Sequence, residues 1–240
     1  MQGTIDKRLI FVVVIFFLNL GQISLGKESE KHNNPSNNIL TAYNSLTPEN
    51  QRPSFEAFRL GMKGKQNLME EGKLKNKRYL TLIDFSLSST QKRLWVIDCD
   101  SLKIVQHTLV AHGKNTGENK AERFSNVPQS NMSSLGFFIA GETYYGKHGF
   151  SLRLDGVEPG INDKARERAI VIHAAEYATM QFVNKHGRLG RSFGCPALPP
   201  EKNKTIIQSI KNKSCVFIYY PEESYFSLSE YASQSNLNNS

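Results

Sequence analysis

The sequence predicts a mainly β protein, built on an antiparallel-dominated sheet to which a few helices are added. Short runs rich in β-branched and aromatic residues recur between residues 79 and 220, and turn residues separate them. These runs do not alternate regularly with helical segments, which argues against a doubly wound fold. With 240 residues, of which 39% are hydrophobic, the chain is long enough to bury one core.

Residues 1–26 have the pattern of a secretory signal peptide. Lys7 and Arg8 precede an apolar run over residues 9–20, and small residues follow at 24–26. The run is too short for a comfortable membrane span, so we expect cleavage, with an uncleaved N-terminal anchor as the alternative. The mature protein is then expected in the periplasm or elsewhere in the cell envelope, as a monomer without stable membrane association.

Residues 27–50 contain an asparagine-rich run and few apolar side chains, so we expect a disordered spacer. Residues 51–76 predict an N-terminal helical segment that packs on the outside of the core. Ser54 is the expected N-cap, although Gly61 and Gly64 lower the helix propensity. The apolar side chains at helical spacing are Phe55, Phe58 and Met62.

The main domain is expected over residues 77–222, followed by a C-terminal tail over 223–240. Two short helices, at 174–184 and 201–212, fit between the last strands. The predicted strands cover residues 79–84, 94–98, 104–111, 137–140, 150–154, 170–173 and 216–220.

One stretch joins a predicted strand to a candidate nucleophile. The apolar run 170–172 ends on His173, and Cys195 lies between Gly194 and Pro196. Glycine lets the backbone approach a ligand, and proline fixes the chain after the thiol. A single cysteine is more often a small buried apolar residue, and a single histidine is more often structural. Together they favour a thiol nucleophile with an imidazole base and backbone N–H groups that hold an oxyanion.

Further motifs accompany this pair. His173 is followed 22 positions later by Ser192-Phe193-Gly194-Cys195. The upstream motifs are Asn115-Thr116-Gly117, Phe124-Ser125-Asn126, Ser133-Ser134-Leu135-Gly136, Gly146-Lys147-His148-Gly149, Asn162-Asp163 and Arg168. Over residues 78–220 the chain resembles the L,D-transpeptidase catalytic domain (YkuD-like) family of peptidoglycan enzymes. Most members have a second His where this chain has Phe193, so it resembles a divergent branch with a Ser-aromatic-Gly-Cys-Pro signature.

The resemblance implies a curved β-sandwich and acyl transfer on peptidoglycan stem peptides, without a cofactor. Cys195 would attack the L,D bond before the terminal D-alanine of a stem tetrapeptide and form a thioester, with His173 as base. The N–H groups of Gly194 and Cys195 would form the oxyanion hole. Many members fix the ring through a Ser beside the His. That neighbour is Ala174 here, so a backbone carbonyl or another side chain must orient the ring.

The acceptor of the acyl group is expected to be an amine on a second stem. The Tyr144-Tyr145 pair and Phe193 are apolar bulk that could exclude water, which favours transpeptidation over hydrolysis. An L,D-carboxypeptidase that uses water, or a non-enzymatic wall-binding module, are the alternatives. NlpC-like hydrolases fit less well because their Cys precedes their His. Sortase-like enzymes need an Arg after the Cys, and none follows Cys195.

Two groups of residues are expected to contact the substrate: a glycine-flanked turn over 141–149, and the residues just before the nucleophile. The two arginines among them could hold a carboxylate as planar forks, or could be solvated loop charges. The candidate substrate-binding residues are Tyr144, Lys147, His148, Arg188, Arg191, Ser192 and Phe193. His112, at the end of an apolar strand, could be a second imidazole near the cleft, but a loop histidine that bonds to the backbone is favoured.

The charge and the motifs of the chain indicate which classes of molecule this protein binds. The formal net charge of +8 favours anionic surroundings, but no aromatic-interleaved basic motif indicates nucleic acid. Stem peptides of the cell wall are therefore the expected partner. The Cys and His residues lack paired short spacings, so no metal site is expected. Cys99 and Cys215 could form a disulfide or remain two separate thiols.

Overall fold

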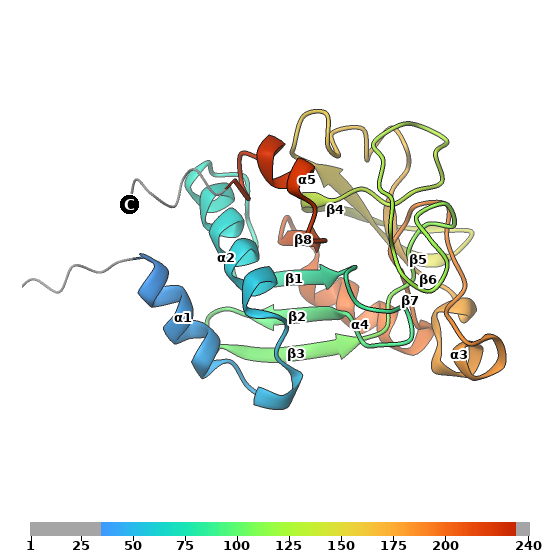
Figure 1. Ribbon diagram of the computed structural model, residues 1–240, viewed down its shortest axis with the longest axis horizontal. Helices are drawn as coiled ribbons and strands as arrows, with labels where there is room; N and C mark the ends of the chain where they lie inside the picture. Colours follow the sequence, from blue (N-terminus) through green and yellow to red (C-terminus); the bar gives the residue numbers. More distant parts are fainter. Residues whose placement is uncertain (1–34, 234–240) are drawn as a thin grey trace, which may run out of the picture. The chain divides into compact units, whose positions relative to one another are not determined.

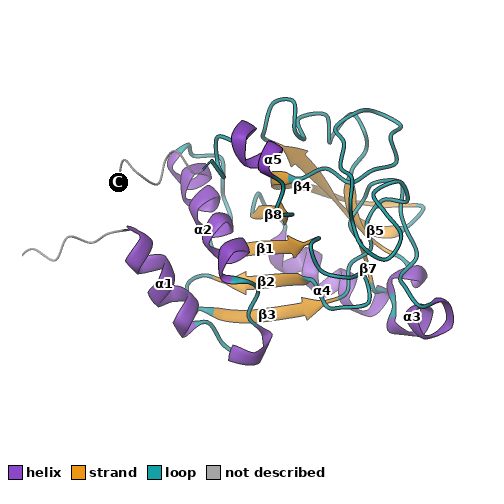
Figure 2. Cartoon of the chain, in the orientation of Figure 1, coloured by secondary structure: helices purple, strands orange, loops and turns teal. Residues whose placement is uncertain are grey.

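The computed structural model describes residues 35–233, and its backbone is a single eight-stranded mixed sheet with helices packed on it (Figures 1 and 2). The predicted signal peptide lies outside the described residues. The strands are β1 (Tyr79–Asp84), β2 (Leu94–Asp98), β3 (Lys103–Thr108), β4 (Gly136–Gly146), β5 (Gly149–Gly156), β6 (Val171–Ala174), β7 (Ala197–Leu198) and β8 (Cys215–Tyr219). The helices are α1 (Pro35–Ser45), α2 (Phe55–Glu70), α3 (Met180–His186), α4 (Pro200–Ile210) and α5 (Glu223–Leu228), with short 3₁₀ turns at Glu49–Gln51 and Glu176–Ala178.

The strand order is β3-β2-β1-β8-β4-β5-β6-β7. Two neighbouring pairs, β1 with β8 and β6 with β7, are parallel, and the remaining pairs are antiparallel. The predicted mainly β, antiparallel-dominated fold is therefore confirmed. The last strand among the described residues, β8, lies in the interior of the sheet between β1 and β4.

Helices cover the centre of the sheet. All five residues of β8 are buried, which requires cover on both faces of the strand. Helix α2 contacts β1 and β8, while α4 contacts β1, β5 and β6 (Figure 1). Phe217 of β8 stacks on Phe137 of β4 with ring centroids 4.2 Å apart, and this pair anchors the core beneath α2.

Helix α2 begins where the sequence predicts. The hydroxyl of Ser54 accepts a hydrogen bond from the Ala57 N–H at 3.3 Å, which is the expected N-cap. The two glycines that lower its helix propensity are packing sites. A Cβ at Gly64 would stand 2.1 Å from the Phe137 ring, so only glycine allows the helix this close to the sheet.

Two segments differ from expectation. Residues 35–45, placed in a disordered spacer by the sequence, form α1, and the adjoining Leu46 is fully buried. The segment predicted as a C-terminal tail contains α5, and Tyr225 and Tyr231 are buried in the core. In both segments sparse apolar side chains meet apolar surface of the main domain, which the local sequence does not reveal.

The strands and helices around the candidate site also differ in detail from those predicted from the sequence. The predicted strand at 137–140 extends to Gly146 through a register shift between Ala140 and Thr143. The predicted helix at 174–184 is divided, because the Thr179 hydroxyl caps a new helix, α3, by accepting from the Phe182 N–H. Strand β7 has only two residues and was not predicted. No helix within residues 35–233 is both long and apolar enough to cross a membrane.

Candidate active site

The candidate nucleophile and base lie on adjoining pieces of chain. Strand β6 pairs in parallel with β7, with His173 opposite Ala197, and Cys195 comes two residues before Ala197. Cys195 lies in a bend before β7, and the His173 N–H donates to the carbonyl of the next residue, Pro196, at 3.4 Å. The two residues, 22 positions apart in the sequence, thus lie on adjoining backbone segments.

The thiol of Cys195 is half-buried between the start of β6 and the residue before it. Its sulfur accepts a hydrogen bond from the Val171 N–H at 3.4 Å and donates to the Ala169 carbonyl at 3.6 Å. Burial raises the pKa of the Cys195 thiol, although the Val171 N–H and the charges of Arg168 and Lys147 oppose this. The resting thiol is therefore protonated at neutral pH.

The imidazole of His173 is buried and is oriented by the backbone carbonyl of the next residue, Ala174. Its Nδ1 lies 2.8 Å from the carbonyl oxygen of Ala174, and because a carbonyl only accepts, Nδ1 carries the proton. The ring is thus oriented by a backbone carbonyl, one of the two possibilities that the sequence left open. Burial lowers the pKa of His173, and the nearby His148 and Lys147 lower it further. A neutral ring in this tautomer has Nε2 free to accept a proton.

Serine hydroxyls fix the loop that carries Cys195. Gly194 has φ +127°, and a Cβ there would stand 2.8 Å from the Met132 carbonyl oxygen, so this position needs glycine. The Ser192 hydroxyl accepts from the Gly194 N–H at 3.0 Å and donates to the Cys195 carbonyl at 2.6 Å. The Ser133 hydroxyl donates to the Gly194 carbonyl at 3.1 Å. These hydrogen bonds fix the backbone on both sides of the Gly194–Cys195 peptide bond.

The predicted oxyanion hole needs a correction. The Gly194 N–H is occupied by the Ser192 hydroxyl and is not available to an oxyanion. Among the described residues, no hydrogen-bond partner is recorded for the Cys195 N–H. Of the two N–H groups predicted for the oxyanion hole, that of Cys195 remains the candidate donor. Ser192 acts as a structural hydroxyl within the loop.

The β4–β5 turn lies beside the candidate base. His148 stacks on His173 with ring centroids 4.4 Å apart, and Lys147 acts electrostatically on both His173 and Cys195. Two of the three residues proposed for this turn therefore adjoin the site. For Tyr144 the recorded ring contact is with the Arg153 guanidinium, 4.6 Å from the ring centroid, and not with Cys195 or His173.

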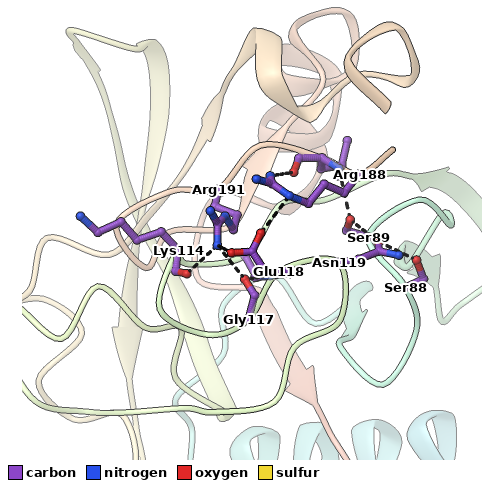
Figure 3. A network of polar contacts seen from close by, with 10 residues as sticks. Ser88, Ser89, Lys114, Gly117, Glu118, Asn119, Arg188 and Arg191 are labelled. Atoms are coloured by element: carbon purple, nitrogen blue, oxygen red, sulfur yellow. Dashed lines mark hydrogen bonds and ion pairs between the residues drawn. The ribbon is translucent and has the colours of Figure 1, made fainter. Parts of the chain in front are cut away.

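Arg188 and Arg191 are held by one carboxylate (Figure 3). Glu118 forms ion pairs with Arg188 at 3.0 Å and with Arg191 at 2.6 Å. Arg191 also donates to the backbone carbonyls of Lys114 and Gly117. Both side chains thus already have an anionic partner. Arg191 lines a surface cavity of ≈ 440 Å³ that also includes Lys114, Glu118 and Arg123.

The aromatic residues expected to exclude water do not cover the thiol. The side chain of Phe193 is 69% exposed, and the ammonium of Lys114 lies 4.8 Å from its ring centroid. Tyr145 is 79% exposed. Because both rings face solvent, they do not exclude water from Cys195 in this structure.

His112 is buried and bonded on both ring nitrogens. Nδ1 accepts from Arg93 at 2.7 Å, and Nε2 donates to the Gly117 carbonyl at 3.2 Å. Burial and the adjoining Arg93 charge lower the pKa of His112 to about 4. The predicted structural role, with a bond to the backbone, agrees with this geometry.

Two neighbours of the thiol were not proposed from the sequence. Arg168 and Tyr177 both interact electrostatically with Cys195, and burial with this interaction raises the pKa of Tyr177 to about 12. Arg168 was noted as part of the family pattern, but nothing in its local sequence gave it a place beside the thiol. All three cysteines are free thiols, so Cys99 and Cys215 are not bridged. Within residues 35–233 no group of three His, Cys, Asp or Glu side chains could hold a metal ion.

Comparison with known proteins places this site in a family. The sequence profile of the L,D-transpeptidase catalytic domain matches residues 49–219, more than two thirds of the chain. No curated protein has a significant sequence match. A thiol and a neutral imidazole on adjoining segments of a mixed sheet define a candidate cysteine-nucleophile site. The chain belongs to the L,D-transpeptidase catalytic domain family.

Several solved structures are similar over part of the chain. An L,D-transpeptidase from Mycobacterium smegmatis has 12% sequence identity and a TM-score of 0.38, over 60% of this chain and 59% of that one. The helical cell shape determining protein Pgp2 from Campylobacter jejuni has 18% identity and a TM-score of 0.39, over 66% and 56%. An L,D-transpeptidase from Mycobacterium tuberculosis H37Rv has 12% identity and a TM-score of 0.36, over 60% and 58%. The match spans less than two thirds of each of these chains, and the family assignment rests on the sequence profile.

Proposed function

We propose that this protein is an exported L,D-transpeptidase that acts on peptidoglycan stem peptides in the periplasm or cell envelope. The observation that carries the proposal is the arrangement at β6. His173 is held as a neutral base by the Ala174 carbonyl, one strand across from the loop that carries Cys195. A thiol beside a neutral imidazole can give up its proton to the ring as the sulfur attacks an acyl group, which is what we propose here.

The first half of the reaction forms a thioester. The Cys195 sulfur attacks the carbonyl carbon of the L,D bond before the terminal D-alanine, and the thiol proton passes to Nε2 of His173. The Cys195 N–H donates to the developing oxyanion. As the C–N bond breaks, His173 returns the proton to the amine of the leaving D-alanine.

The second half transfers the acyl group. The amine of a second stem attacks the thioester carbon, and His173 accepts its proton. A C–N bond forms, the C–S bond breaks, and the proton returns to the Cys195 sulfur. The site requires no metal ion or cofactor for these steps, because each uses only the thiol, the imidazole and a backbone N–H.

A second reaction, hydrolysis of the thioester, has a specific observation in its favour. Phe193 and Tyr145 are largely exposed, so neither shields Cys195 from solvent. Aminolysis in water requires an oriented acceptor or the exclusion of water. If substrate binding does not supply one of these, the same residues make an L,D-carboxypeptidase.

The test is incubation of the purified protein with a disaccharide-tetrapeptide, followed by mass analysis of the products. Cross-linked dimers that have lost one D-alanine are expected. Tripeptide monomers alone, even at millimolar acceptor, would identify an L,D-carboxypeptidase. If neither product forms while the protein binds purified cell wall, the protein is a non-enzymatic wall-binding module.

A further inference from the structure

Arg168 is a half-buried arginine whose guanidinium is bonded only to neutral oxygens. It donates to the Ser125 and Met132 carbonyls at 2.6 and 2.5 Å, and to the Ser134 and Ser130 hydroxyls at 2.5 and 3.2 Å. Among residues 35–233, no carboxylate forms an ion pair with it. Arg166, two residues earlier, is exposed and pairs with Glu142 and Asp155.

A partly buried cation without a counter-ion is costly, because burial disfavours the charged form. Burial lowers the pKa of Arg168, and the interaction with Cys195 opposes this. The serine and carbonyl oxygens satisfy the N–H donors, but they do not neutralise the charge. An anion that forms close by would therefore be stabilised.

The geometry places Arg168 against the segment that carries the thiol. Nη2 lies 3.3 Å from the point where a Cβ of Gly194 would stand, directly before Cys195. The Met132 carbonyl touches both, at 2.8 Å from that point and 2.5 Å from Nη2. The sulfur itself bonds to the backbone of Ala169 and Val171, which follow Arg168 in the chain. The segment 168–171 thus lies against the thiol.

The remaining groups that face the thiol cannot replace this charge. Lys147 lies on the exposed β4–β5 turn, where solvent screens it. Tyr177 is a phenol that stays protonated, and His173 is neutral at rest. Arg168 is the partly buried permanent cation in this set.

We propose that Arg168 is a positioning residue for Cys195. Its guanidinium fixes the 125–134 loop behind Gly194, and its charge stabilises the thiolate as the proton leaves. This inference rests on the proposed role of Cys195 as nucleophile. It adds the group that offsets the effect of burial on the thiol.

The test measures the rate of Cys195 alkylation by iodoacetamide as a function of pH, with peptide mass spectrometry to separate Cys195 from Cys99 and Cys215. In Arg168→Met, alkylation at pH 7 is expected to slow by about tenfold, and the pH midpoint to rise. Arg168→Lys keeps the charge and is expected to keep a midpoint near that of the parent. Arg166→Met is the matched control and is expected to leave both unchanged.

A folded Arg168→Met protein with the parental midpoint would overturn the proposal. If Arg168→Met does not fold, as judged by circular dichroism, Arg168→Lys decides: a rise of its midpoint despite the retained charge would equally overturn it. Ser130→Ala with Ser134→Ala removes two hydrogen bonds and keeps the charge, so its midpoint is expected to stay. Alkylation requires no turnover, so a failure of the proposed function, seen as retained activity in Cys195→Ser, is distinguishable from a failure of this inference.

Discussion

Burial acts in opposite directions on the two groups that are proposed to exchange a proton. It raises the pKa of Cys195 and lowers that of His173, so both are neutral in the resting protein. The site is therefore not a preformed thiolate–imidazolium pair. The proton must move as the sulfur attacks, which makes the position of His173 as important as its basicity.

Cys195→Ser is expected to abolish product formation while the fold is kept. A serine hydroxyl beside a neutral imidazole is a far weaker nucleophile than a thiolate. Product formation and circular dichroism should be measured on the same preparation. Residual activity within about tenfold of the parent, a barrier difference of about 1.4 kcal/mol, would remove Cys195 from the mechanism.

His173 should determine the acid side of the pH profile. Because the pKa of His173 is lowered from 6.5, kcat/KM is expected to have reached its maximum at neutral pH and to fall only at pH values below 6.5. His173→Gln is expected to lose most activity and this acid limb, since no base remains. His112→Gln tests the assignment: a loss of activity there, with a mild effect in His173→Gln, would mean that the base was misassigned.

At the scale of elements, glycine positions determine how closely helix α2 approaches the sheet. Helix propensity alone favours Gly64→Ala by about 1 kcal/mol. The added Cβ, however, would stand 2.1 Å from the Phe137 ring, which is fully buried and stacked on Phe217. Overpacking of a core costs about 1–3 kcal/mol and should outweigh the propensity.

Gly64→Ala is therefore expected to lower the free energy of unfolding in urea by about 1–3 kcal/mol. Gly61→Ala in the same helix is the matched control. Its Cβ would lie 3.2 Å from Leu80 and 3.3 Å from Phe217, where side chains can adjust. Equal stability of the two variants would show that Phe137 can move at little cost.

A buried carboxyl links the C-terminal helix to the sheet. Glu158 accepts hydrogen bonds from the Phe137 N–H at 2.6 Å and from the hydroxyls of Ser229 and Tyr225. Burial raises the pKa of Glu158 to about 7 from the ordinary 4.5. The folded protein thus binds this proton more tightly than the unfolded chain. The resulting stability is complete below about pH 4.5 and is lost as pH rises through about 7.

In Glu158→Gln this pH dependence should disappear. The difference between a pKa of about 7 and one of 4.5 corresponds to about 3 kcal/mol. The free energy of unfolding in urea should be measured for parent and variant at pH 5 and pH 8. The two proteins should be similarly stable at pH 5, and the variant should lose less stability than the parent between pH 5 and pH 8. Parallel curves for parent and variant would mean that Glu158 does not titrate in this range.

The limits of prediction from sequence also show at this scale. Strands β1 and β2 were predicted with their exact bounds because alternating and apolar runs are local signals. Strand β7 was missed because two residues carry no period. The Cys195–His173 pair could be chosen because each residue has distinctive chemistry and a recognisable neighbourhood. Glu118 could not be paired with Arg188 and Arg191, because contacts across about 70 residues leave no local trace.

At the scale of the whole molecule, the sheet depends on β8. A chain that ends at residue 213 lacks this strand, and the edges of β1 and β4 lose their partner. We expect no cooperative thermal unfolding by circular dichroism for this truncation. A chain that ends at residue 221 keeps β8 but lacks α5, and is expected to unfold cooperatively with lower stability. A cooperative transition in the shorter chain would contradict a central role for β8.

The place of β8 also affects the timing of folding. Leu80 of β1 pairs with Cys215 of β8, so β1 cannot form this pairing until the chain has been synthesised 135 residues further. At about 5–20 residues per second, ribosomal synthesis of that interval takes about 7–27 s. Such non-local pairing folds slowly, because a long loop must close before its contacts form. The nascent chain should therefore remain sensitive to protease until residues beyond 219 have left the ribosome, however well its first strands match their local pattern.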